Sequence, residues 1–284
     1  MNPFVRAFMR RCGAPLLNRA LQRWPALGPV MLIGLVLFVL WMTFRATPHH
    51  RHAHHHSVIS SQGMTMQGPV GNPKECAQLF EGGKAPTAGE VLCNRDYAVG
   101  YDSSRKEPLW SAERLNRAQV KAAEALHGRA SFHEDNRLPS AQRVGADDYR
   151  RSGWSAGHLT PSSDMPDPES RWESFAYSNI VPQDGTMNSG PWLQLEEQTR
   201  HLAQKDGVVY VITGPAWHKR VGVIGQDQLE VPSSFWKVVY APSTGQAMGA
   251  VCHNEHTFQC RRVSVQAIEQ VVGFRLFPAL PSQP

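Results

Sequence analysis

The chain has 284 residues, enough for one well-packed domain with an anchor or for two small domains. With 41% hydrophobic and 19% charged residues, its composition is ordinary for a globular protein. Five of the 29 basic residues lie in residues 1–25, which contain no acidic residue, so the remaining basic residues balance the 24 acidic ones. The sequence pI of about 9.1 therefore reflects the N-terminus, and overall charge is excluded as evidence for a nucleic-acid partner.

The first element in chain order is an apolar run over residues 26–44, which carries no charge. At a rise of about 1.5 Å per residue, it is just long enough to cross a hydrocarbon core of about 30 Å. The arginines of residues 1–25 favour a cytoplasmic basic tail. We predict a single-pass signal anchor in the inner or plasma membrane, with the rest of the chain periplasmic or extracellular. A cleaved signal peptide and a buried core helix are the alternatives.

We predict a linker over residues 45–84. It begins with a His-rich tract at residues 49–56 and continues through a stretch rich in Ser, Gly, Gln and Pro. The tract either binds transition metals, which would suit a metal sensor, or is a solvated spacer. We favour the spacer.

Residues 85–280 show the patterns of one mixed domain. Short apolar runs bounded by Gly, Pro or turn residues predict strands at Tyr97–Tyr101, Leu109–Arg114, Gly207–Pro215 and Ser234–Tyr240. Helices are predicted from Pro191 to about Lys205 and over Val265–Val272. This mixture of elements indicates an α+β fold with an antiparallel sheet.

Four cysteines fall in the part of the chain that we expect outside the cytoplasm. An even number in an oxidising compartment indicates two disulfides. Pairing by proximity joins Cys76 to Cys93 and Cys252 to Cys260, although the sequence allows three connectivities. A zinc site is disfavoured, because no two of these cysteines form a close C-x2–4-C pair.

One histidine lies in a glycine-bounded turn, and amide and carboxylate groups follow it near a predicted helix start. These are His158, Asn179, Asn188 and Glu196. Phosphodiester hydrolysis needs a base to deprotonate water and a cation to neutralise charge on the phosphate. A neutral imidazole suits the first task, and Mg²⁺ with oxygen ligands suits the second. Each residue also has an ordinary interpretation: a structural turn, a helix cap, or an i,i+4 surface pair of Glu196 with Arg200.

The order and spacing of several motifs extend this pattern over most of the predicted domain. They are Gly157-His158-Leu159-Thr160-Pro161, Asn179-Ile180-Val181-Pro182-Gln183, Asn188, Trp192-Leu193-Gln194-Leu195-Glu196 and Arg200. The arrangement resembles the DNA/RNA non-specific endonuclease family, the ββα-metal nucleases. This resemblance implies a ββα-metal fold, with a central antiparallel sheet flanked by helices. It also implies metal-dependent hydrolysis of DNA and RNA.

The resemblance implies a role for each matching residue. His158 would be the general base that activates water. Asn188 would bind a single Mg²⁺ or Mn²⁺, and Glu196 would hold metal-bound water. Asn179 would position the histidine turn or the substrate, and Arg200 would support the site one helical turn beyond Glu196.

One departure from the family pattern concerns the phosphate contact. Ser155-Ala156 stands where the family has Asp-Arg, and the loss of one preorganised contact can cost about 10²-fold in rate. Arg150 and Arg151 are nearby candidates to replace it, and Arg129 stands about where the family has another phosphate-contacting arginine. Three interpretations stay open: an active nuclease with a rewired contact, a weak nuclease, and a membrane-tethered DNA-binding pseudoenzyme.

Overall fold

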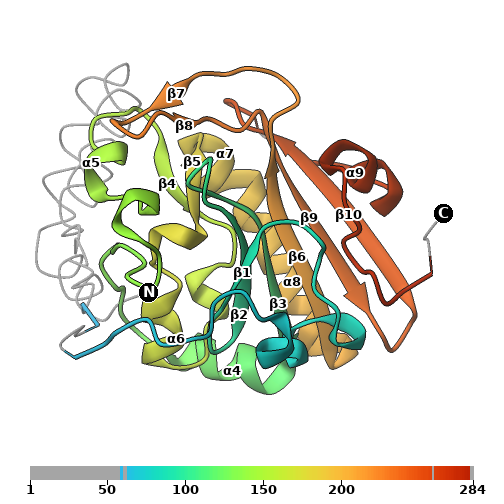
Figure 1. The fold of residues 1–284 in the computed structure, drawn as a ribbon. Coiled ribbons are helices and arrows are strands. Elements are labelled where there is room, and N and C mark those ends of the chain that lie inside the picture. The colour runs from blue at the N-terminus through green and yellow to red at the C-terminus, as the bar shows by residue number, and fades with distance from the viewer. Residues whose placement is uncertain (1–57, 60–62, 258, 282–284) are drawn as a thin grey trace, which may run out of the picture. The chain divides into compact units, whose positions relative to one another are not determined.

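The structure is a computed structural model that describes residues 58–59, 63–257 and 259–281 (Figure 1). The predicted tail, membrane anchor and His tract lie outside these residues. Within the described part of the chain, none of the helices combines the length and the apolar character that crossing a bilayer requires. The anchor at residues 26–44 therefore stays a prediction.

Eleven strands are described: β1 Glu90–Cys93, β2 Tyr97–Asp102, β3 Glu107–Asn116, β4 Ser155–His158, β5 Ile180–Gln183, β6 Val208–Ala216, β7 Val223–Ile224, β8 Leu229–Glu230, β9 Ser234–Ala241, β10 Gln246–His253 and β11 Arg261–Val263. The α-helices in the described residues are α4 Arg117–Ala125, α5 Ala146–Tyr149, α6 Pro168–Glu173, α7 Gly185–Met187, α8 Leu193–Asp206 and α9 Val265–Val272. Short 3₁₀ turns are η1 Pro73–Leu79, η2 Glu81–Gly83, η3 Ser140–Gln142, η4 Ser162–Asp164 and η5 Tyr177–Asn179, and η6 Asn188–Trp192 is a π-turn.

Seven strands form one sheet in the order β1-β2-β3-β6-β9-β10-β11, and every neighbouring pair is antiparallel. Two smaller antiparallel pairs, β4-β5 and β7-β8, lie outside it. The predicted pairing of the strands near Tyr97 and Leu109 is confirmed as β2-β3, and its turn is fixed by Asp102, whose carboxylate accepts from the backbone of Ser104 and Arg105. The α+β prediction with a central antiparallel sheet is confirmed.

Successive side chains of each strand point to opposite sides of the large sheet. Other elements pack against both of these faces. On β6, Val209 and Val211 face α4 and α8, where they pack with Val120 and Ala203. This is the face along which α8 lies in Figure 1. The α8 face carries the candidate site described below.

The opposite face of the sheet holds the larger apolar cluster. Trp110, Ile212 and Trp236 point to it and pack with Phe80 and with Ile268 of α9. Helix α9 begins after the N-cap Ser264 and ends before Gly273 at φ 80°, the left-handed conformation that glycine adopts without strain. The predicted helix over Val265–Val272 is therefore confirmed with its bounds.

The packed region begins before residue 85, inside the stretch that we predicted as linker. Cys76, Leu79 and Phe80 are buried in the core, and the ring of Phe80 meets Trp110 at a centroid distance of 6.0 Å. Composition favoured a linker because polar residues and glycine surround the few apolar residues of residues 73–84. Two disulfides join Cys76 to Cys93 and Cys252 to Cys260, as pairing by proximity predicts.

Candidate active site

The α8 face of the sheet changes from apolar to polar along its strands. Ser111, Thr213 and Lys237 are cross-strand neighbours on β3, β6 and β9, and all three are buried. The Lys237 ammonium donates to Thr213 Oγ1 at 2.7 Å, and Thr160 Oγ1 donates to Ser111 Oγ at 2.9 Å. This hydrogen-bonded row forms a polar floor on which the turn after His158 rests.

The β4-β5 pair carries the histidine and explains two of its neighbours. Gly157 pairs with Val181, and the side chain of Gln183 lies against it. A Cβ atom on Gly157 would lie 2.1 Å from Gln183 Cδ, so any larger residue there would displace the Gln183 side chain. The Gln183 amide also donates to the backbone oxygen of His158 at 3.4 Å. These contacts fix the end of β4, where the imidazole begins.

Asn179 holds the turn that follows the histidine. Its side chain is fully buried, accepts from Thr160 N at 3.0 Å, and donates to the oxygens of Thr160 and Ser174, both at 2.9 Å. Its backbone oxygen also accepts from Leu159 N at 3.0 Å. Asn179 is not among the pocket-lining residues given below. Of the two roles predicted for it, the contacts fit positioning of the histidine turn.

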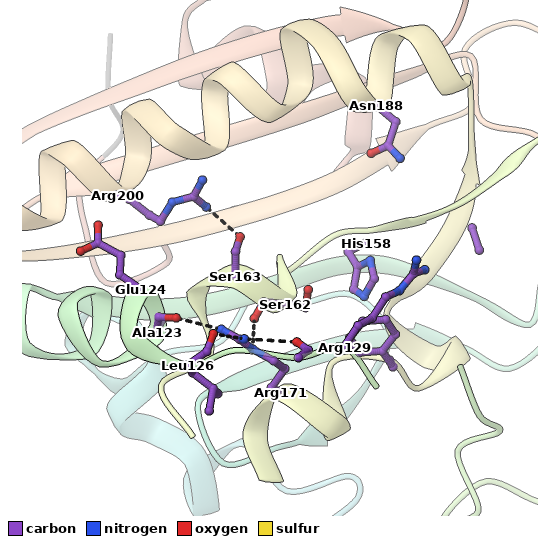
Figure 2. A pocket seen from close by; sticks show the side chains of 13 residues that line it. Ala123, Glu124, Leu126, Arg129, His158, Ser162, Ser163, Arg171, Asn188 and Arg200 are labelled. Carbon is purple, nitrogen blue, oxygen red and sulfur yellow. Dashed lines mark hydrogen bonds between the residues drawn. The ribbon is translucent and has the colours of Figure 1, made fainter. Parts of the chain in front are cut away.

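A pocket of about 550 Å³ opens where these elements meet α8 (Figure 2). It is lined by Ala123, Glu124, Leu126, Gly128, Arg129, Ala156, His158, Ser162, Ser163, Arg171, Phe175, Asn188 and Arg200. Four predicted site residues therefore share one pocket: Arg129, His158, Asn188 and Arg200. In Figure 2, the first three lie at one end and Arg200 at the other. Ala156, the departure from the family pattern, also faces this space.

His158 brings a neutral imidazole to the pocket. Its ring is half-buried, but Nε2 itself is shielded and has no hydrogen-bond partner among the described residues. The rings of Phe132 and Phe175 pack against it, with centroids 5.5 and 4.7 Å away. Burial, and to a lesser extent the charge of Arg129, hold the pKa of His158 below its usual 6.5. The imidazole is therefore neutral near pH 7.

Asn188 offers an uncommitted amide to the pocket. It lies where α7 passes into the π-turn η6, a distortion that recurs at functional sites. Its side chain is half-buried, and it has no hydrogen bond to any described residue. Asn254 supports this loop from behind, since it accepts from Asp184 N at 2.7 Å and donates to the oxygens of Pro182 and Pro232. Asn254 lies within the loop closed by the Cys252–Cys260 disulfide, and no sequence pattern marked it.

Glu196 lies in the first turn of α8 and is buried rather than part of the pocket lining. Burial raises its pKa to about 8, against the opposing charge of Lys237. No three His, Cys, Asp or Glu side chains gather as a metal cage within the described residues. Mg²⁺ keeps several waters and takes few protein oxygens, a demand that the uncommitted Asn188 amide in the pocket fits.

Arg200 pairs across the pocket wall rather than along its own helix. Its guanidinium donates to Asp164 at 2.7 Å and to Ser163 Oγ at 3.0 Å, and the Asp164 carboxyl is fully buried. The ordinary surface pair with Glu196 is therefore not its main contact. Sequence inspection missed Asp164, because the two partners are 36 residues apart.

Four other arginines divide into one without a side-chain partner, one that holds the backbone, and an exposed pair. Arg129 makes no side-chain hydrogen bond or ion pair with the described residues, and its guanidinium lies over the Phe132 and Phe175 rings at 5.4 and 5.6 Å. Arg171, which no motif indicated, donates to the oxygens of Ala123, Leu126, Gly128 and Ser162 and so holds the end of α4.

Arg150 and Arg151 do not line the pocket. Both are exposed, and Arg150 pairs with Asp147 at 2.9 Å. The candidates that sequence proximity suggested as replacements for the missing arginine therefore lie elsewhere, while Arg129 lies beside His158 (Figure 2).

Comparisons with known proteins agree with this site. The family model for DNA/RNA non-specific endonucleases matches residues 77–283. The mitochondrial nuclease EXOG of Danio rerio is 33% identical over 66% of this chain and 61% of its own length. The Homo sapiens EXOG nuclease is 31% identical over 76% of this chain and 64% of its own. The chain thus spans less than two thirds of the length of these relatives.

Among solved structures, a crystal structure of the EndoG/EndoGI complex, described as a mechanism of EndoG inhibition, superposes with a TM-score of 0.65. The match has 26% sequence identity and covers 72% of this chain and 92% of that one. Fold, site and sequence agree, and the chain belongs to the DNA/RNA non-specific endonuclease family.

Proposed function

We propose that the chain is a metal-dependent endonuclease that hydrolyses phosphodiester bonds of DNA and RNA. The observation that carries this proposal is the neutral His158, which lines a pocket together with Arg129 and Asn188. A base, a cation for phosphate and an uncommitted oxygen donor are the groups that the reaction needs. We also propose that β4, β5 and α8 form the ββα-metal unit of the family.

His158 accepts a proton from the attacking water, and the turn held by Asn179 keeps the imidazole in place. Arg129 binds the scissile phosphate and offsets charge that develops on it. Asn188 would hold Mg²⁺ or Mn²⁺, with Glu196 supporting its water shell. When bound, the metal supplies a positive charge that stabilises the phosphate and the leaving oxygen. Contacts of this kind read phosphates rather than bases, so base specificity is low.

For location, we propose that residues 26–44 anchor the chain in the inner or plasma membrane and that residues 85–280 act outside the cytoplasm. The uncharged run and the preceding arginines support the anchor. The two disulfides support an oxidising compartment.

The test is cleavage of supercoiled plasmid and of RNA by the full-length chain in detergent, with Mg²⁺ and with EDTA. His158→Ala should abolish cleavage, and His201→Ala is the matched control, since His201 is exposed on α8 and does not line the pocket. Cleavage that requires metal and His158 supports the proposal. DNA binding without cleavage, by a folded and oxidised chain, would instead support the pseudoenzyme that Ala156 suggests.

A further inference from the structure

A segment that precedes the family match at residue 77 contacts the active site from behind. We call residues 58–59 and 63–71 the strap. Figure 1 shows it as the light-blue trace that leads into η1. Its C-terminal end extends the sheet, because Gly71 N donates to Val91 O at 2.8 Å and Cys93 N donates to Pro69 O at 2.9 Å. The strap is therefore fixed to β1 at one end.

The other end of the strap pairs with the loop that carries Arg129. Val58 forms a parallel bridge with Arg129, and Ile59 N donates to Arg129 O at 3.1 Å. The bond from Ile59 N to Arg129 O lies outside helices and strands. It is the one backbone–backbone hydrogen bond of this kind that joins residues 127–132 to other described residues. The loop follows Gly128 at φ 106°, so its path is weakly determined by its own sequence. The contact with Ile59 adds backbone support at Arg129 itself.

The middle of the strap packs under the aromatic rings of the site. Met66 is buried in one apolar cluster with Ala130 and Phe175, and Met64 and Phe132 complete its edge. Phe132 and Phe175 are the rings that contact His158 and lie beneath the Arg129 guanidinium. The strap thus supports both the backbone of Arg129 and the rings on which its side chain lies.

We propose that the strap is a positioning element of the active site, and that it holds Arg129 where a substrate phosphate binds. This inference rests on the proposed nuclease function. Arg129 has no side-chain hydrogen bond or ion pair within the described residues. The position of its guanidinium therefore depends on its backbone and on the Phe132 and Phe175 rings below it. The missing arginine at Ala156 increases this dependence, because Arg129 is the uncommitted cation beside His158.

Removal of one backbone N–H tests the proposal in the full-length chain. Ile59→Pro deletes the N–H that donates to Arg129 O, and Ile59→Ala keeps it as the matched control. Cleavage of a defined duplex is measured at constant Mg²⁺ and several salt concentrations. Ile59→Pro should lower kcat/KM by about fivefold or more, while Ile59→Ala should stay within about twofold. The salt dependence of Ile59→Pro should fall by about one phosphate contact, as for Arg129→Ala.

A double-mutant cycle separates positioning from a general loss of structure. If Ile59 acts through Arg129, Ile59→Pro has no further effect in an Arg129→Ala background. If the losses of kcat/KM in the two single variants multiply in the double variant, the inference is overturned. Equal activity of the Ile59→Pro and Ile59→Ala variants would overturn it too. Either result would leave the nuclease function standing. A wild-type chain that cuts neither DNA nor RNA would overturn both. If Ile59→Pro does not unfold cooperatively, Met66→Ala replaces it in the same double-mutant cycle. No further loss of kcat/KM in the Arg129→Ala background is then expected, and losses that multiply would overturn the inference.

Discussion

Replacing Asn179 by alanine should both destabilise the fold and slow the chemistry. The change removes three buried hydrogen bonds, two to Thr160 and one to Ser174. At about 1 kcal/mol each, with a further cost for backbone groups left unpaired, the free energy of unfolding should fall by at least about 3 kcal/mol. The turn after His158 then loses its support, and a misplaced base should lower kcat by about 10²-fold. KM should change little, because Asn179 does not line the pocket.

Urea unfolding followed by tryptophan fluorescence, with disulfides kept oxidised, measures the stability loss, and plasmid cleavage gives kcat and KM. Asn136→Ala is the matched control, because Asn136 is exposed and its side chain has no hydrogen bond to a described residue. A loss below about 1 kcal/mol with unchanged kcat would refute the reasoning, since three buried bonds must contribute more than that. A raised KM at unchanged kcat would make Asn179 a substrate contact instead.

Four further predictions concern the site and the two exposed arginines. Because burial lowers the pKa of His158, the imidazole stays neutral until the pH falls below 6.5, so the acid limb of the kcat/KM profile should lie below that value; a limb at or above 6.5 would contradict the assignment. Asn188→Ala should raise the Mg²⁺ concentration needed for half-maximal cleavage by more than about tenfold, the effect typical of losing a partner that only supports a metal ligand. An unchanged Mg²⁺ titration would show that Asn188 does not bind the metal. Arg150→Ala should alter kcat/KM by less than about twofold, as expected for an exposed ion-paired residue. Arg151→Gly should leave activity equally unchanged and raise the free energy of unfolding by about 1 kcal/mol, since Arg151 has φ 58°. A larger activity loss in either arginine variant would return that residue to the substrate path.

Periodicity and turn chemistry predicted the elements whose sequence is locally consistent. Strands β6 and β9 are apolar runs with clear boundaries, and α9 has both a serine cap and a glycine stop. The expected helix from Pro191 begins instead as the π-turn η6 before α8, because Gly190 adopts a non-helical φ and ψ. The buried stretch around Leu79 was missed because its apolar residues belong to no local period and are buried by distant strands.

The site residues, too, fall into those that the sequence predicted and those that it did not. Family motifs identified the residues that reach the pocket from β4 and from the turn before α8, such as His158 and Asn188. They did not identify Asp164, Arg171 or Asn254, whose roles depend on partners far along the chain. Arg150 and Arg151 show the opposite error, since adjacency in sequence placed them near the site while the backbone turns their side chains to solvent.

The contact between Gly157 and Gln183 has a consequence for how this protein can vary. Any side chain at position 157 would occupy the space that the Gln183 side chain fills, although the two positions lie in separate motifs. A larger residue at position 157 therefore requires a smaller or displaced side chain at position 183, so the two positions are coupled. A library that randomises the histidine motif alone would consist largely of inactive clones, whereas one that varies both positions jointly would open sequence space that single steps cannot reach.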